Sequence, residues 1–167
     1  DVSATATYSA AAGEVLYRGV ESSIGFRPWR FIRFDAAHTF ALNTFVDFVD
    51  GGIDFSGKYN PASPKHHFNG RVTVYPIEGL RVEFEGDHIS RYFSNSLNTD
   101  NYARPNLYNL RPAYKVNDKV EIWGHALNLF DVKYADRISA TNVAIPVRSI
   151  SEGYTPLTMR AGVSLKW

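Results

Sequence analysis

The sequence predicts an all-β protein, an antiparallel meander of about seven strands. Apolar and polar residues alternate with a period of two along most of the chain, turn-forming residues separate the alternating stretches, and short connections alternate with long ones. Successive side chains of a strand point to opposite faces of a sheet. Each alternating stretch therefore has one apolar face and one polar face.

The first three expected strands are residues 14–26, 30–42 and 68–75. In 14–26 the alternation is partial, and Glu21 lies opposite the apolar positions. In 30–42 the apolar side is nearly continuous, with His38 as its exception. In 68–75 aromatic and branched apolar residues alternate regularly with polar ones, as β-strands favour.

Four more strands are expected at residues 80–92, 107–116, 120–128 and 157–167. The strand at 80–92 alternates most regularly, and its charged face carries Arg81, Glu83, Glu85 and Asp87. Pro112 weakens the strand at 107–116, because proline cannot donate to a β-ladder. The last strand has Val163, Leu165 and the terminal Trp167 on its apolar side.

Tight hairpin turns are expected at residues 27–29, 76–79 and 117–119, which carry proline, glycine, asparagine or aspartate. The long connections are roughly residues 45–66, 93–104 and 129–154. Because short and long connections alternate strictly, an antiparallel meander places all the tight turns at one end and all the long loops at the other.

The composition excludes several classes of protein. Lys and Arg number 18 against 17 Asp and Glu, and a formal net charge of +1 argues against a nucleic-acid partner. With 44% hydrophobic and 21% charged residues, the chain is not intrinsically disordered. It has no cysteine, which excludes disulfides and thiolate metal sites. No apolar run approaches the length of a transmembrane helix, and no signal peptide is expected within these residues.

Two architectures fit this pattern, a soluble β-sandwich or lipocalin-like barrel and an outer-membrane barrel. Aromatic residues gather near the expected strand ends, at Trp29, Phe31, Tyr75 and Trp167. Outer-membrane barrels combine aromatic girdles with short turns at one end, long loops at the other and an apolar outer face. The expected strands are also long enough to cross a tilted path through a bilayer. The membrane barrel is therefore favoured, and a soluble ligand-binding β-protein remains an alternative.

Several motifs resemble, in the same order, those of TonB-dependent outer-membrane receptors. They are Tyr17-Arg18-Gly19-Val20-Glu21, Asp54-Phe55-Ser56-Gly57-Lys58, Pro64-Lys65-His66-His67-Phe68-Asn69, Leu107-Tyr108-Asn109-Leu110-Arg111, Asn128-Leu129-Phe130-Asp131 with Tyr134-Ala135, and Met159 to Trp167. The motif that begins at Asn128 is the most specific. The terminal Trp167 departs from the phenylalanine that is more usual there.

The resemblance implies a 22-stranded barrel of the bacterial cell outer membrane, with a plug domain in its lumen. Its function would be import of an iron–siderophore or similar scarce ligand, energised by the TonB complex through the plug. Residues 1–167 would form the C-terminal segment of this barrel, without the plug and the earlier strands. Residues 1–13 look like the tail of one more surface loop. The alternative is a passive or structural barrel of the porin or adhesin type.

The resemblance also implies roles for three groups of residues. The lumen-facing and plug-facing group is Arg81, Glu83, Glu85, Asp87 and Glu21, for which a solvated, mutually paired wall is the simpler interpretation. A candidate ligand group in or beside the long loops, where an ordinary polar loop is the alternative, is Tyr92, Tyr102, Arg104, Arg137 and Arg148. The terminal strand, read by the barrel-assembly machinery, contributes Val163, Leu165 and Trp167.

No catalytic, cofactor or metal site is expected. Adjacent His66 and His67 would point to opposite faces of a strand, and His38, His88 and His125 lie on separate strands without ligand spacing. The chain has no zinc-protease, nucleophile-elbow, dinucleotide-binding or phosphate-loop motif. The expected partners are the plug and remaining strands, the TonB complex, the assembly machinery, outer-membrane lipid and the ligand.

Overall fold

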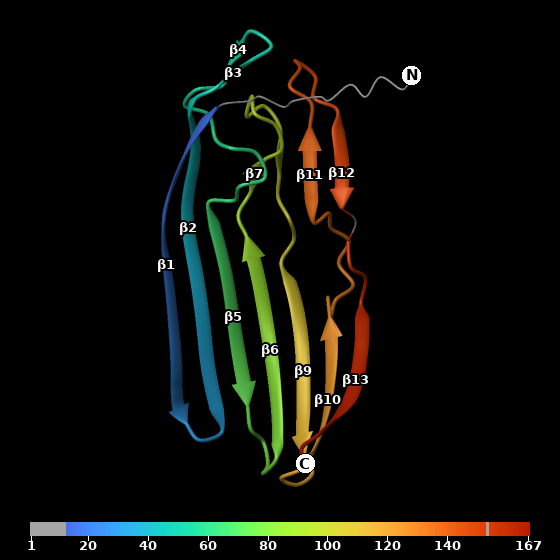
Figure 1. Ribbon diagram of the computed structural model, residues 1–167. Helices are drawn as coiled ribbons and strands as arrows, with labels where there is room; N and C mark the ends of the chain where they lie inside the picture. Colours follow the sequence, from blue (N-terminus) through green and yellow to red (C-terminus); the bar gives the residue numbers. More distant parts are fainter. Residues whose placement is uncertain (1–12, 153) are drawn as a thin grey trace, which may run out of the picture.

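The computed structural model describes residues 13–152 and 154–167, and it confirms the meander (Figure 1). One antiparallel sheet holds seven strands, namely β1 (Glu14–Trp29), β2 (Ile32–Asp47), β5 (His66–Val74), β6 (Leu80–Ile89), β9 (Leu107–Lys115), β10 (Val120–Leu127) and β13 (Thr158–Leu165). Neighbours in this order are paired, so that β1 and β13 form the two edges of the described sheet. The prediction for residues 1–12 lies outside the described residues.

The three long connections contain short hairpins that the sequence did not predict. They are formed by β3 (Val49–Asp50) with β4 (Ile53–Asp54), β7 (Tyr92–Phe93) with β8 (Asn101–Tyr102), and β11 (Arg137–Ala140) with β12 (Arg148–Glu152). Figure 1 shows these hairpins at one end of the sheet and the tight turns at the other, as expected. We call residues 48–65, 90–106 and 128–157 together the loop layer. Within the described residues there is no helix of membrane-spanning length and hydropathy.

The strand register separates a polar face from an apolar face. A row of paired residues on the polar face is Arg33, Thr73, Glu83 and Arg111. The neighbouring row on the apolar face is Phe34, Val72, Phe84 and Leu110. Because side chains alternate strictly between faces, these two rows fix the face of every residue in the central strands.

The predicted turn at residues 27–29 is wrong. Strand β1 continues through Trp29, which pairs with Ile32, and the turn is formed by Arg30 and Phe31. Pro28 is tolerated because the register of β1 against β2 shifts between Phe26 and Trp29, so no ladder bond is required there. The rings of Trp29 and Phe31 stack across the turn, with centroids 5.9 Å apart.

Pro112 does not break β9 but does disturb one side of it. The pairing with β6 is continuous and includes Val82 opposite Pro112. The pairing with β10 instead passes directly from Ala113 and Trp123 to Leu110 and Ala126. Since proline has no N–H to donate, this local opening of one ladder is the expected consequence.

Buried and exposed side chains are distributed unusually. Most buried side chains lie at the loop-layer end, including Phe45, Phe55, Tyr92, Asn95, Asn128, Ala135 and Ile138. Along the apolar face of the sheet, large side chains remain exposed, among them Val20 at 67%, Ile24 at 69% and Met159 at 73%. Contiguous apolar surface of this kind marks a membrane or protein contact.

Candidate lumen wall and loop layer

A network of ion pairs and hydrogen bonds covers the centre of the polar face. Glu85 accepts hydrogen bonds from the Nδ2 atoms of Asn69 and Asn109, each at 2.9 Å. Arg111 lies 2.6 Å from a Glu85 carboxylate oxygen and 3.0 Å from one of Glu83. Glu83 and Glu85, two of the carboxylates that the sequence assigned to the lumen, thus lie together on this face, and each is paired with Arg111.

Asp87 forms a second cluster nearer the loop layer. His67 Nε2 lies 2.7 Å from Asp87 Oδ2, and Arg104 forms an ion pair with the other carboxylate oxygen. The side chain of Arg104 is only 13% exposed. Its buried Nε has no hydrogen-bond partner among the residues that the structure describes. This cluster therefore offers one N–H donor to a group from outside the described chain.

The remaining two residues of the predicted lumen group lie on the same face but away from this centre. Arg81 pairs with Ala113 near the tight turns, and Glu21 pairs with Thr39 on the outer strand pair. All five members of the group therefore share the polar face, and Arg111 joins two of them, Glu83 and Glu85.

Arg148 fastens two loop hairpins to one another. Its Nη2 donates to Asp100 Oδ1 at 2.8 Å, and its Nε donates to Asp100 Oδ2 at 2.9 Å. The hydrogen-bonded Arg148 guanidinium, together with the Ser94 hydroxyl, holds the pKa of the Asp100 carboxyl below its usual range. The sequence placed Arg148 in the ligand group, and the structure places it in an internal bidentate ion pair.

Tyr92 and Tyr102 hold the third long connection, residues 128–157, by hydrogen bonds to its backbone. The Tyr92 hydroxyl accepts a hydrogen bond from Ile138 N at 3.2 Å, and the Tyr102 hydroxyl accepts one from Ala135 N at 2.9 Å. Burial raises the pKa of Tyr92. Their rings meet edge to face, with centroids 5.7 Å apart. Of the five predicted ligand residues, Arg137 and Arg148 are exposed, and Arg148, Tyr92, Tyr102 and Arg104 make the contacts within the chain described above.

Asparagines that the sequence did not single out join the three long connections. Asn98, with a positive φ of 59°, accepts from Tyr59 N at 2.7 Å and donates to Tyr59 O at 2.9 Å. Buried Asn95 donates to Thr141 O at 3.1 Å and accepts from Thr99 N at 3.1 Å. Each asparagine side chain thus bonds to the backbone of a distant segment, where no β-ladder joins the two segments.

The motif that begins at Asn128 connects the end of β10 to the start of β13. Asn128 and Asp131 both have a positive φ of 49°, a conformation that asparagine and aspartate tolerate better than most residues. Asn128 Nδ2 donates to Thr155 O at 2.9 Å, and Asp131 Oδ1 accepts from Leu157 N at 2.9 Å. The residue types of the motif are therefore those that this junction requires.

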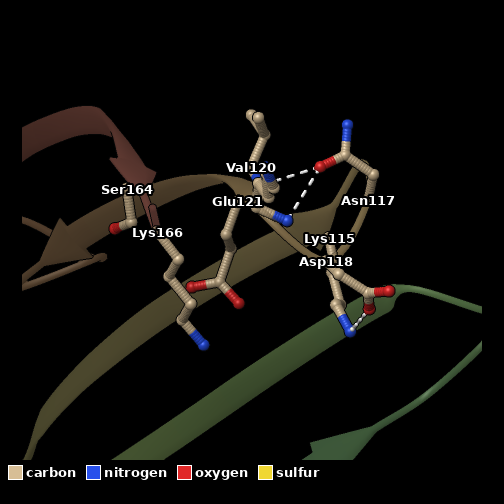
Figure 2. A pocket seen from close by; sticks show the side chains of 8 residues that line it. Lys115, Asn117, Asp118, Val120, Glu121, Ser164 and Lys166 are labelled. Carbon is tan, nitrogen blue, oxygen red and sulfur yellow. Dashed lines mark hydrogen bonds and ion pairs between the residues drawn. The ribbon is translucent and has the colours of Figure 1, made fainter.

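At the opposite end of the sheet, a cavity of about 70 Å³ lies beside the β9–β10 turn (Figure 2). Asn117 Oδ1 accepts hydrogen bonds from Lys119 N at 2.9 Å and Val120 N at 3.0 Å. Lys115 Nζ lies 2.7 Å from Asp118 and lowers the pKa of that exposed carboxyl. These are contacts that stabilise a turn, and Figure 2 draws those of Asn117 and of Lys115 with Asp118 as dashed lines.

The terminal strand completes the described sheet. Val163 pairs with Ile122 and Leu165 with Val120, and both side chains are exposed on the apolar face. Lys166 N donates to Lys119 O at 2.8 Å, which ties the end of the chain to the β9–β10 turn. Trp167 follows this contact and is fully exposed.

The histidines are arranged partly as predicted. His66 and His67 contact partners on opposite faces, His38 and Asp87 respectively. His38, His88 and His125 lie on separate strands, as predicted, but His38 Nε2 lies 3.1 Å from His66 Nδ1, a contact that the sequence did not predict. No group of three or more histidine or carboxylate side chains suited to a metal occurs among the described residues. The sequence could have indicated this contact, because His38 and His66 fall on the same face of two neighbouring strands.

No family model matches the sequence, and no curated protein matches it. Solved structures do match. The ferric citrate transporter FecA in its unliganded form superposes with a TM-score of 0.73 and 18% identity, over 93% of this chain and 25% of that one. BauA, the ferric preacinetobactin receptor from Acinetobacter baumannii, gives 0.66 and 21%, over 92% and 22%. The ferric yersiniabactin uptake receptor FyuA from Yersinia pestis gives 0.66 and 15%, over 90% and 23%.

The chain has the fold of a barrel segment of the TonB-dependent receptors. The resemblance seen in the sequence motifs is thereby confirmed for the fold. The chain spans a quarter or less of the length of these three structures. The three structures are an uptake receptor, a transporter and a receptor for ferric ligands.

Proposed function

We propose that this chain is the C-terminal barrel segment of an outer-membrane receptor that imports an iron–siderophore or a similar scarce ligand. One observation carries the proposal: a single sheet has an exposed apolar face, a polar face with paired charges at its centre, and all its long loops at one end. A bilayer outside and a polar lumen inside would satisfy both faces. The transport receptors among the structural neighbours support this interpretation.

The polar face would line the lumen and contact a plug domain that other residues of the receptor supply. Paired groups such as Glu85 and Arg111 present a nearly neutral wall. The unpartnered N–H of Arg104, beside Asp87, would donate to a plug carbonyl. The TonB complex would act through that plug, with no covalent chemistry in this segment.

The loop layer would form part of the ligand side. Exposed Arg137 would make direct contact, while Tyr92, Tyr102, Arg104 and Arg148 would hold the surrounding surface in shape. The side chains at Val163, Leu165 and Trp167 would meet lipid and, before insertion, the barrel-assembly machinery.

Deletion of the full receptor gene tests the proposal. We expect a growth defect under iron limitation that added iron salts abolish, together with loss of labelled ferric-siderophore uptake. Unchanged uptake and growth under iron limitation would instead favour a passive or structural barrel of the porin or adhesin type. Partition of the full receptor into buffer without detergent would contradict both and favour a soluble β-protein.

A further inference from the structure

The apolar face of the sheet is not smooth, because two glycines lie opposite each other in its central strands. Gly70 of β5 pairs with Gly86 of β6, and together they form the floor of a hollow of about 330 Å³. The side chains of Phe68, Phe84 and Tyr108 stand around this floor. The rings of Phe84 and Tyr108 stack with their centroids 5.6 Å apart, so one wall of the hollow is a continuous aromatic surface.

Backbone conformation does not explain these two glycines. The described glycines that have a positive φ lie in turns and loops, whereas Gly70 and Gly86 lie within regular strands. Glycine weakens a strand interior, and it often marks a position that a ligand approaches closely. A β-carbon at Gly70 would lie 3.0 Å from the Phe68 ring, and one at Gly86 would lie 3.3 Å from the Tyr108 ring. What the two glycines provide is therefore space on the apolar face.

The floor and aromatic walls of the hollow call for a hydrocarbon occupant if the apolar face meets a membrane, so the inference rests on the proposed function. Aromatic and aliphatic side chains, over a backbone that is already paired, offer water no hydrogen-bond partners. If the hollow stayed empty, the atoms that line it would lose their dispersion contacts on one side. A lipid acyl chain is the component of a bilayer that is both apolar and flexible enough to fill it.

The end of the hollow nearest the loop layer is polar. There His88 Nδ1 lies 2.7 Å from Asn106 Oδ1, and Asn106 is the last residue of its segment of the loop layer. This contact uses the amide oxygen and leaves the Nδ2 atom of the exposed Asn106 side chain as a donor. An ester or amide carbonyl, of the kind that joins an acyl chain to its headgroup, is an acceptor that fits this end. The hollow is therefore amphipathic in the same sense as a lipid.

We propose that this hollow binds one lipid acyl chain from the leaflet on the loop-layer side, with the lipid carbonyl at Asn106 and the methylenes over Gly70 and Gly86. A second hollow on the same face, of about 360 Å³, is the matched comparison. Its lining includes Gly124 and the exposed Met159, and it lies between β9 and β13, away from the stacked rings. Lipid should meet both hollows, but only the first should hold a chain in one place.

The test uses the full receptor that carries this segment, reconstituted in phosphatidylcholine vesicles. A small fraction of the lipid is phosphatidylcholine with a photoreactive diazirine halfway along one acyl chain, and the cross-linked peptides are identified by mass spectrometry. Gly86→Leu fills the floor of the hollow, whereas Tyr108→Ala removes part of its wall without adding volume. Ala126→Leu, in the second hollow, is the control. The unfolding midpoint of each variant shows whether it is folded.

We expect cross-links to concentrate within residues 68–72 and 84–88 and to saturate at a single lipid per receptor as the fraction of probe rises. In Gly86→Leu and Tyr108→Ala this labelling should fall to the level of the second hollow, and in Ala126→Leu it should be unchanged. Equal labelling of the two hollows, or undiminished labelling in either site variant, would overturn the proposal while leaving the membrane barrel intact. Absence of label from the whole apolar face would contradict the membrane barrel as well.

Discussion

The sheet and the loop layer differ in where their apolar side chains go. In the sheet, Val20, Ile24 and Met159 are exposed on a face that the described residues leave uncovered. In the loop layer, Phe55 and Tyr92 are buried although the backbone there is mostly irregular. The sheet is held together by continuous ladders, whereas the loop layer is held together by its own small core and by side-chain hydrogen bonds.

This difference is the one expected if the apolar face of the sheet meets the hydrocarbon of a membrane, as proposed, and the loop layer meets water. A face rich in exposed valine, isoleucine and phenylalanine is stable against hydrocarbon, because no polar backbone group of a paired strand is left unsatisfied there. A layer of loops that stands in water has to bury its own apolar groups to become ordered. The boundary between the two regions passes near His66, where β5 begins.

The largest change in stability is expected when a charge is placed on the apolar face. We expect Val163→Arg to lower the free energy of unfolding in lipid vesicles by about 2–4 kcal/mol, the cost of arginine at the lipid-facing midplane. Val82→Arg should behave in the same way. The measurement is denaturant unfolding of the full receptor in vesicles.

Ser164→Arg is the matched control, because Ser164 pairs with Glu121 on the polar face next to Val163. Its unfolding free energy should change little. Glu83→Arg is a less clean control, since it also breaks the pair with Arg111. Equal losses for Val163→Arg and Ser164→Arg would contradict the assignment of the apolar face to lipid.

The second effect belongs to the loop layer. We expect Asn95→Ala to destabilise this layer by about 1–3 kcal/mol, because buried donors and acceptors such as Thr99 N and Thr141 O lose their partner. Hydrogen exchange should show lost protection at Thr99 and unchanged protection in β5 and β6. Val143→Ala, at a half-exposed side chain of the connection that carries Thr141, is the control. Loss of protection throughout the sheet would show that the two regions unfold as one.

The same contrast explains what the sequence could and could not predict. All seven strands of the sheet were predicted, because a period of two depends only on local residue types, and the register then placed Glu83 and Glu85 on one face. The error at residues 27–29 arose where a bulge decides the outcome, and the contact between His38 and His66 was missed because it depends on the strand register. A local pattern does not contain that information.

In the loop layer, the decisive contacts join residues far apart in the sequence. Arg148 and Asp100 are 48 positions apart, and Asn98 and Tyr59 are 39 apart. The sequence identified Arg148, Tyr92 and Tyr102 as chemically notable, which they are. It assigned them to a ligand, because no local signal indicated the partners that they contact within the chain. Their role toward a ligand stays a prediction.

A smaller effect concerns acid. The pKa of Asp100 is lowered in the folded protein, so the carboxylate form stabilises the loop layer above the ordinary Asp value of about 3.9. That stabilisation is lost as the pH falls through the lowered pKa. Because Arg148 is about half exposed, we expect only about 0.2–1 kcal/mol. Protease cleavage within residues 139–147 should therefore increase at acid pH in the wild-type receptor. In Asp100→Asn the rate of this cleavage should not change as the pH falls. The same increase in both proteins would exclude the ion pair of Asp100 with Arg148 as its cause.

The smallest effect on stability is expected at Trp167, which follows the last strand of the sheet and would lie at the membrane–water interface. This residue is fully exposed beyond the last ladder contact, so its removal breaks no packing within the described chain. We expect deletion of Trp167 to leave the unfolding midpoint of receptor refolded in vesicles nearly unchanged. The amount of receptor in the outer membrane should nevertheless fall while its rate of synthesis stays constant, because the terminal strand would be recognised before insertion. Trp167→Phe, which retains an aromatic side chain, should restore the amount. If membrane abundance is normal after the deletion, Trp167 acts only as an interfacial anchor of the kind that aromatic residues provide at membrane boundaries.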